Sequence, residues 1–393
     1  MRFVGILFFT GLGLLAQDAA KPDITKEGSE WVRTQTGVVP VLPQTIGLEV
    51  HAQGSIVVRG TSENRVSYIL TQRTSGGSRT EAQARLILNG GGVRQVVNGA
   101  PQTMVLWSLG SSVNVTTTLQ LTVPATFRTA VLDVGLGGDI SIYDFGGNVL
   151  ARTGSGSIRG GRIHGSMNAS TASGDIRFDG AIDGTIDCVT GAGSITIENA
   201  GGRVNCQTGG GQTTVKQAAG AVTLHAEGGD ISVERAGASV DARSASGLID
   251  VKEAGGNVVA LTRGGSIVVG PAHGVRAESG QGKIHVYGVS GPLSLSAAMG
   301  SILAELVAGA QIQESTFLSR AGDLTLSLPS NVAVSVMATQ DSGDNPRIQS
   351  DFPGFRANAF GWQPRPVMVQ GAINGGGPVF HLSAPVIYLR KIK

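Results

Sequence analysis

The sequence predicts an all-β fold, a single-chain parallel β-solenoid in which about eleven coils of roughly 18 residues stack along one axis. Three observations lead to this prediction. The composition is rich in glycine and aliphatic residues, a glycine-led unit recurs with a nearly constant step, and a second glycine series runs half a step out of phase.

The composition favours many short strands joined by tight turns. Glycine accounts for 60 residues and proline for 14, while 41% of the chain is hydrophobic and 5% is aromatic. Such apolar content can form a core, which a disordered glycine-rich chain cannot do. Glycine tolerates the backbone angles that turns need, and β-branched residues suit strands. The net charge of +2 and the lack of a Lys/Arg block argue against a nucleic-acid partner.

The repeated unit is a glycine followed two residues later by an aliphatic or β-branched residue. Successive units are 17 to 19 residues apart, apart from a final step of 22. Chance would not hold such a register. The units begin at Gly138, Gly156, Gly174, Gly193, Gly211, Gly229, Gly247, Gly265, Gly282, Gly300 and Gly322.

Each coil is expected to hold two short strands, because the second glycine series divides every repeat. Alternation along a strand sends Ile195 and Ile197 inward and leaves Thr196 and Glu198 outside. Stacking at about 4.8 Å then builds one continuous apolar core and a rod about 50 Å long. A small residue such as Ala181 or Ala200, seven positions after the lead glycine, suits a tight corner. Apolar residues do not recur every six positions, which favours a right-handed coil over a hexapeptide left-handed one.

The N-terminal residues 1–20 resemble an export leader. Met1 and Arg2 give a basic start, residues 3–15 are mostly apolar, and small residues follow. An apolar run of about 13 residues is too short to span a bilayer, which needs about 20. The alternative is a buried first strand. No later segment resembles a transmembrane helix, so we expect export to the periplasm, the cell surface or the extracellular space. Residues 21–44 are expected to be a linker.

Both ends of a solenoid need caps, because open coil ends expose unpaired strand edges. Residues 45–135 are expected to form an N-terminal antiparallel cap, with strands over 48–59, 65–73, 84–88, 103–107 and 114–123. The solenoid repeats cover 136–328. Residues 329–393 are expected to form a C-terminal β/loop cap, with a long loop over 341–366 and a final strand pair over 379–389.

The C-terminal loop contains four aromatic residues, Phe352, Phe355, Phe360 and Trp362. They have two interpretations. The rings could plug the last coil, or they could form an exposed platform for a sugar or a peptide. In the second case Phe355 and Trp362 are candidate ligand contacts.

Four kinds of stretch recur in a pattern typical of one protein family. They are Gly54–Val58, Leu121–Pro124, units such as Thr171–Ile176 and Thr190–Ile195, and Asn374–Gly377 ahead of the last strand. On these stretches the chain resembles the bacterial putative-adhesin family, a β-solenoid domain of unknown function related to autotransporter adhesin heads. The likeness covers nearly the whole chain after the leader. The resemblance implies an adhesin-like surface role and brings no catalytic residues with it.

No catalytic, cofactor or metal site is predicted. The six histidines are each isolated in the local sequence, and no nucleophile-elbow motif occurs. The Asp after the lead glycine in four units resembles part of a calcium-binding roll, but acidic residues do not occupy that position in adjacent coils. Those four residues are Asp139, Asp175, Asp230 and Asp323.

One outward group deserves comparison with β-helical polysaccharide lyases and hydrolases. Arg159 and Arg177 are expected to stack in one outward column beside Asp175. These residues are candidate ligand contacts, and the alternative is a solvated charge ladder. Cys188 and Cys206 occupy the same inward position in successive coils. Stacking would bring them within disulfide range, so they form either a vertical disulfide or two buried free thiols.

The sequence thus favours an exported, non-enzymatic, adhesin-like or envelope-associated binding module. A rigid polar surface suits weak multivalent contact with glycan, peptidoglycan or an envelope or surface protein. The alternatives are a structural or envelope-stress protein without a dedicated ligand and, third, a β-helical polysaccharide-degrading enzyme.

Overall fold

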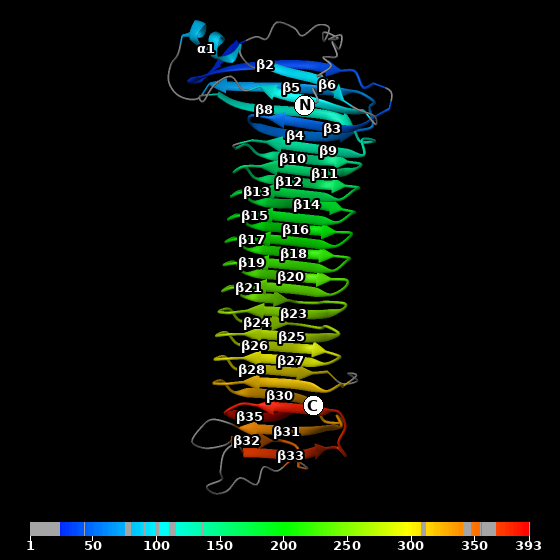
Figure 1. Cartoon of the computed structure of the whole chain (residues 1–393), viewed down its shortest axis with the longest axis vertical. Coiled ribbons are helices and arrows are strands. Elements are labelled where there is room, and N and C mark those ends of the chain that lie inside the picture. Colours follow the sequence, from blue (N-terminus) through cyan, green and yellow to red (C-terminus); the bar gives the residue numbers. More distant parts are fainter. Residues whose placement is uncertain are drawn as a thin grey trace, which may run out of the picture.

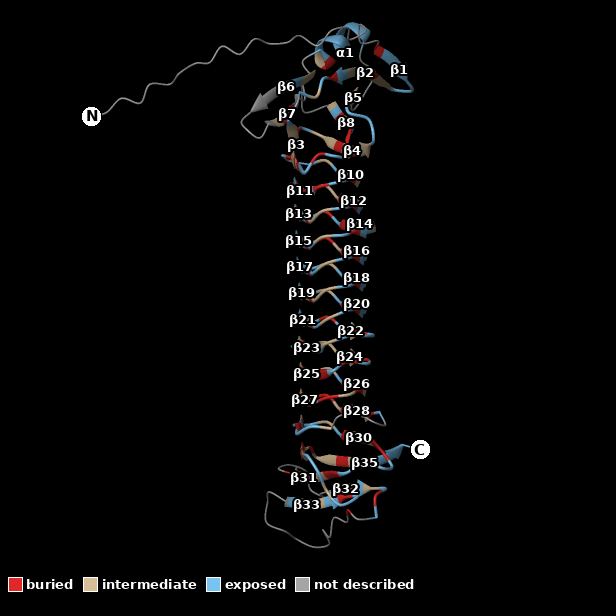
Figure 2. Cartoon of the chain, turned by 90° about the vertical axis from the view of Figure 1, so that its right-hand side faces the viewer, coloured by how far each residue is buried: buried red, intermediate tan, exposed pale blue. Residues whose placement is uncertain are grey.

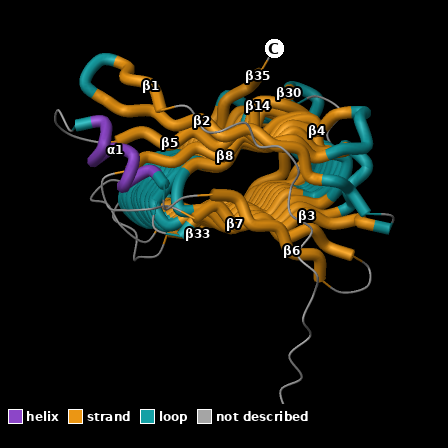
Figure 3. Tube along the Cα trace, turned by 90° about the horizontal axis from the view of Figure 1, so that it is seen from above, coloured by secondary structure: helices purple, strands orange, loops and turns teal. Residues whose placement is uncertain are grey.

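The chain forms a long rod of stacked β-coils, with its N-terminal strands at one end and its C-terminal strands at the other (Figure 1). Seen along the rod axis, two sheets face each other and loops close the two sides (Figure 3). The predicted leader, residues 1–20, lies outside the described residues. This computed structural model describes residues 24–42, 44–74, 80–89, 92–98, 102–109, 115–135, 137–307, 312–340, 347–353, 355 and 367–392.

Two sheets, called sheet A and sheet B, run the length of the rod. In spatial order sheet A contains β1 (Ile24–Glu27), β2 (Glu30–Val39), β5 (Val66–Thr74), β8 (Val115–Pro124), β4 (Ser55–Thr61), β10 (Ile140–Phe145), β12 (Ile158–Ile163), β14 (Ile176–Ile182), β16 (Ile195–Ala200), β18 (Thr213–Ala218), β20 (Ile231–Ala236), β22 (Ile249–Val251), β24 (Ile267–Val269), β26 (Ile284–Val289), β28 (Ile302–Leu306), β30 (Leu324–Pro329), β35 (Val386–Ile392) and β32 (Arg347–Ser350). Sheet B contains β6 (Gly92–Asn98), β7 (Gln102–Leu109), β3 (Thr45–Ala52), β9 (Thr129–Val134), β11 (Asn148–Thr153), β13 (Met167–Thr171), β15 (Ile186–Thr190), β17 (Val204–Thr208), β19 (Val222–Ala226), β21 (Val240–Ser244), β23 (Asn257–Thr262), β25 (Gly274–Ser279), β27 (Leu293–Ala297), β29 (Ser315–Ser319), β34 (Val379–Ser383), β31 (Val334–Gln340) and β33 (Val367–Ile373).

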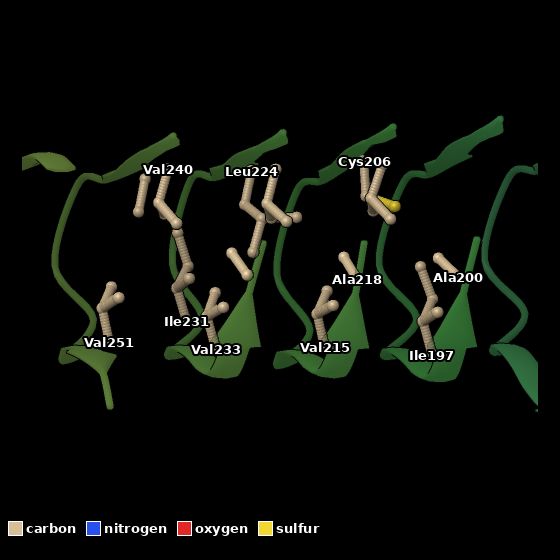
Figure 4. Close-up of a cluster of buried hydrophobic side chains, with 14 of the residues drawn as sticks. Ile197, Ala200, Cys206, Val215, Ala218, Leu224, Ile231, Val233, Val240 and Val251 are labelled. Carbon is tan, nitrogen blue, oxygen red and sulfur yellow. The ribbon is translucent and has the colours of Figure 1, made fainter. Parts of the chain in front are cut away.

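The predicted 18-residue register is confirmed along the middle of the rod. Ile140 pairs with Ile158, which pairs with Ile176, and the column continues without a break to Leu324. Neighbouring coils pair in parallel, and the inward side chains of every coil are buried (Figure 2). Figure 4 shows side chains of sheet A, Ile197, Val215, Val233 and Val251, facing Cys206, Leu224 and Val240 of sheet B. Each fully buried aliphatic side chain contributes about 1.5–3 kcal/mol, so the core column is the main source of stability.

The corner at each lead glycine leaves no room for a side chain. A Cβ atom placed on Gly229 would lie 1.9 Å from the Gly211 carbonyl oxygen of the coil before. A buried hydroxyl holds the same corner, because Thr208 donates to the Gly193 carbonyl at 2.8 Å and accepts from the Gly211 amide at 3.1 Å. This explains the Thr that precedes the lead glycine by three positions. Equivalent corner hydroxyls belong to Thr153, Thr171, Thr190, Ser244, Thr262, Ser279 and Ser319.

One corner residue departs from the sequence expectation. Ala181 is exposed, and Ile182 takes the buried position that Ala200 holds in the next coil. The register shifts between Phe178 and Ala181, which marks a β-bulge. The extra residue also accounts for the 19-residue step in the repeat.

The N-terminal end differs from the predicted linker and antiparallel cap. Residues 24–39 of the expected linker form β1 and β2, which pair antiparallel with each other and with β5. Within the expected cap, β3–β4 and β7–β8 form two further solenoid coils that pair in parallel. Antiparallel pairing within residues 45–135 joins β5 to β8 and β6 to β7, and β5 also pairs antiparallel with β2.

The strand expected at residues 84–88 is instead the end of helix α1 (Glu81–Leu88). Thr80 and Gln83 form a capping box, and Arg85 lies 2.7 Å from Glu81 one turn away. These local signals outweigh the short apolar run. The helix packs on β2 and β5 with Ala84 and Leu88 buried. Within the described residues, no helix has both the length and the apolar character required to cross a bilayer.

At the C-terminal end the last coil in the sequence is not the last coil in space. The expected strand pair over 379–389 forms β34 and β35, and it lies between the coil β29–β30 and the coil β31–β32 (Figure 1). The chain must therefore pass over this coil between β30 and β31. The Asn374 side chain ties down that passage by donating to the carbonyls of Ser330 and Val332 at 2.9 and 2.7 Å.

Candidate functional site

The arginine group predicted from the sequence is assembled, but without Asp175. Arg159 and Arg177 are register partners on β12 and β14, and both point outward. The Arg177 Nε donates to Asp179, and its guanidinium lies 4.0 Å from Glu198. The pattern of the sequence did not identify Asp179 as the carboxylate partner, because it lies beside the β-bulge. These contacts make a solvated charge ladder.

Asp175 has a structural role that the sequence analysis missed. Its Oδ1 accepts a hydrogen bond from the Ser194 amide at 2.8 Å, at the corner of the next coil. Asp139 and Asp230 make the same contact to the amides of Ser157 and Leu248. The carboxylate after the lead glycine therefore fastens one coil to the next. The sequence did contain a signal for this role, since these Asp residues occupy the same position in their repeats.

Cys188 and Cys206 are register partners in the core, between β15 and β17. Both are buried and free in the structure. Burial raises the pKa of the Cys188 thiol well above its ordinary value of 9.0, and the neighbouring Cys206 raises it further. A protonated Cys188 thiol is a poor nucleophile at neutral pH, and both buried cysteines pack in the core. Whether the pair can be oxidised remains a prediction.

The aromatic residues of the C-terminal loop divide into two groups. Phe352 and Phe355 are buried in the core, 4% and 3% exposed, which agrees with a plug and not with a platform. The Phe355 ring covers Gly371, where a Cβ atom would lie 2.4 Å from it. The Phe355 ring is therefore not exposed to a ligand, contrary to the prediction from the sequence. Phe360 and Trp362 lie outside the described residues.

An exposed aromatic stack that the sequence analysis missed lies near the N-terminal end of sheet B. The Trp107 ring is 4.2 Å from the His51 ring and nearly parallel to it, and Trp107 is 42% exposed. The His51 Nε2 lies 2.6 Å from Glu49, and its Nδ1 lies 3.7 Å from Asp133. Cross-strand register brings these residues together from three strands that are far apart in the sequence.

A surface groove of about 540 Å³ crosses β23, β25 and β27 on sheet B. We call it the sheet B groove. Gly274 lies between Asn257 and Pro292 where the strands begin, so one coil lacks a side chain at this position in the groove. The residues that line it are Asn257, Val258, Val259, Gly274, Val275, Arg276, Pro292, Leu293, Ser294, Glu314 and Thr316.

The chemistry of the sheet B groove is amphipathic. Arg276 is held in the groove by two hydrogen bonds to Glu278 at 2.9 and 2.7 Å, which leaves part of its guanidinium toward solvent. Glu314, at the other end, lies 3.2 Å from His381. Val259 and Pro292 supply apolar surface between these charges. Polar groups around a small apolar patch suit a ligand with hydroxyl groups and a C–H face.

A second concavity, of about 660 Å³, lies on sheet A. It is lined only by charged and amide side chains, namely Glu198, Asn199, Lys216, Gln217, Glu234, Arg235, Lys252 and Glu253. Within the described residues, no group of three or more His, Cys, Asp or Glu side chains is arranged to hold a metal ion.

Comparison with known proteins agrees with this architecture. The family model described as Toastrack DUF4097 matches residues 44–259, from β3 into β23. Among curated proteins, none matches the chain significantly. The chain is also similar to solved structures from two bacterial species. A "putative cell adhesion protein" from Clostridium sporogenes has 9% identity and a TM-score of 0.19, covering 91% of this chain and 100% of its own. A "putative adhesin" from Bacteroides fragilis has 16% identity and a TM-score of 0.22, covering 75% and 95%.

Proposed function

The chain belongs to the Toastrack DUF4097 family, and we propose that it is an exported, non-enzymatic binding module that contacts glycan chains of the envelope or of a surface. The observation that carries this proposal is the sheet B groove. It combines a cation, a carboxylate and hydroxyl groups with an apolar patch on a rigid face, and its volume suits one or two sugar rings.

The rigidity of the rod supports binding over catalysis. Parallel pairing from coil to coil fixes the groove, so little conformational entropy is lost when a ligand binds. The charged residues considered for a polysaccharide-degrading enzyme are engaged elsewhere. Asp175 is bonded to the Ser194 amide, and Arg177 is bonded to Asp179. A general acid must reach the glycosidic oxygen, and Asp175 is held at a coil corner.

The test is binding to an array that contains peptidoglycan fragments and surface glycans, followed by calorimetry with the best ligand. Arg276→Ala should weaken binding about tenfold or more, because a hydrogen bond to a charged group contributes about 1.5–3 kcal/mol. Gly274→Ser should also weaken it by narrowing the groove, since Ser239 already occupies the matching position two coils earlier.

Arg243→Ala is the matched control. Arg243 pairs with Asp241 on the same sheet, as Arg276 pairs with Glu278, but it lies outside the groove. Equal loss of binding in Arg243→Ala and Arg276→Ala would show that the sheet B groove is not the glycan-binding site. No binding to any glycan would instead favour a structural envelope protein, and turnover of a polysaccharide would favour an enzyme.

A further inference from the structure

A column of alternating charge lies on the outer face of sheet A. It consists of Glu198, Lys216, Glu234 and Lys252, which each follow the second inward aliphatic residue of β16, β18, β20 and β22. We call it the charge column. The side chains are 27%, 45%, 46% and 56% exposed. Within the chain, Lys216 lies 2.7 Å from Glu198, and Lys252 lies 3.8 Å from Glu234.

An alternating column with an even number of charges matches itself when it is reversed. If a second rod lies face to face and antiparallel, Glu198 faces Lys252 and Lys216 faces Glu234. The symmetry axis then runs along the strands, between the coils of Lys216 and Glu234. A two-fold axis along the rod would instead place every charge opposite its own copy. Charge complementarity therefore selects one of the two face-to-face arrangements.

The neighbouring columns of sheet A are also compatible with this two-fold axis. In the column before the charge column, Thr214 faces Ser232, Thr196 faces Asp250, and Arg177 faces Val268. None of these pairs joins two like charges.

The column that follows the charge column is also compatible. Gln217 faces Arg235 and Asn199 faces Glu253, so each charge meets an amide. Amide side chains can accept from a guanidinium and donate to a carboxylate.

We propose that two copies of this chain associate side by side and antiparallel through the outer faces of sheet A, centred between Lys216 and Glu234. A face six coils long at about 4.8 Å and about six residues wide at about 3.3 Å spans roughly 600 Å² per partner. That area is typical of a weak, transient interface. The sheet B grooves would face away from each other on the two outer sides of the pair. The proposal does not depend on what those grooves bind.

Sedimentation velocity of the purified chain at low and high ionic strength tests the association. A monomer–dimer equilibrium that weakens with salt is expected, because exposed charges are screened. Glu234→Lys and Lys216→Glu should each weaken the dimer about tenfold or more, since both place like charges in the centre of the interface. Circular dichroism should show an unchanged fold for both, because the side chains are exposed.

An equimolar mixture of the two variants gives the sharpest result. The glutamate introduced at position 216 of one copy faces the lysine introduced at position 234 of the other, and every remaining pair in the column is again opposite in charge. The mixture should therefore form a 1:1 heterodimer more tightly than either variant associates with itself. Glu278→Lys and Arg243→Glu make the same changes in net charge on sheet B. Each of these control variants should dimerise as strongly as the wild-type chain.

Three results would overturn the proposal. They are a wild-type chain that stays monomeric at low salt and high concentration, a dimer that both single variants retain, and a mixture that fails to associate. None of these outcomes bears on glycan binding, which is measured separately at the sheet B groove.

Discussion

The coils in the middle of the rod stack in a different order from the coils at its two ends. In the middle, from β10 to β30, each coil pairs with the next coil in the sequence. At the ends, coils pair out of sequence order. Ile56 of β4 pairs with Ile140, and Leu324 pairs with Ile387. Antiparallel strands then close each end, β5 on β8 and β33 on β31.

A regular array of coils and a closed end therefore need different orders of strand pairing. Serial stacking can continue indefinitely and leaves an open edge at each step. Placing a coil out of order ties distant segments together, so the terminal coil cannot peel away without breaking pairings on both sides. We therefore expect the middle to tolerate changes of length and the C-terminal end to resist them.

Deletion of a coil should give the largest contrast. Removing residues 212–229 joins Gly211 to Asp230 in register, so the rod should fold one coil shorter with a modest loss of stability. Removing residues 379–393 takes away β34 and β35 with their buried Phe380 and Ile387. This loss should exceed about 5 kcal/mol and promote aggregation. Thermal unfolding and size-exclusion chromatography measure both, and equal losses would contradict the distinction.

A smaller effect should separate two adjacent glycines in one corner. Gly229→Ala would bring a Cβ atom to 1.9 Å from the Gly211 carbonyl oxygen, and should destabilise the chain by about 3 kcal/mol or more. Gly228→Ala meets its nearest atom at 3.8 Å and should change stability by less than about 0.5 kcal/mol. Chemical denaturation compares the two, and a similar cost at both positions would refute the close-packed corner.

The repeat could be predicted from the sequence because every middle coil repeats the same local physics. Ile195, its inward neighbours and the lead glycines recur at a constant step, so the register follows from counting. The ends could not be predicted this way, since their partners are distant in the sequence and share no period. The pairing of Ile56 with Ile140 leaves no local trace.

The candidate sites likewise include one that follows from the repeat and others that do not. The pairing of Arg159 with Arg177 followed from the repeat. The sheet B groove did not, because it depends on the absence of a side chain at Gly274, beside Pro292, in one coil. The Trp107–His51 stack joins strands whose order in space differs from their order in the chain.

The corner hydroxyls should contribute next in size. Thr208→Val keeps the shape but removes a hydroxyl that both donates and accepts in a buried corner. The cost should be about 1–3 kcal/mol, because the carbonyl of Gly193 and the amide of Gly211 lose a partner. Thr196→Val on the outer face is the control and should cost less than about 0.5 kcal/mol. Urea denaturation would reject the hydroxyl ladder if both variants behaved alike.

The smallest effect concerns pH. Because the folded pKa of the Cys188 thiol is raised above 9.0, the folded chain holds this proton more tightly than the unfolded chain. The contribution is fully present below pH 9.0 and is lost as pH rises above that value. Melting temperature should therefore fall above pH 9.0, and Cys188→Ala should make that fall shallower. An identical slope in the variant would show that other groups control alkaline stability.

The most direct measurement of the central claim is the distance between spin labels placed on one outward column of sheet A. Labels at Arg159 and Asp250 lie five coils apart, and labels at Arg159 and Thr325 lie nine coils apart. At about 4.8 Å per coil, pulsed electron resonance should give about 24 Å and about 43 Å. Distances that do not grow in proportion to the number of coils would contradict a rod built on one 18-residue register.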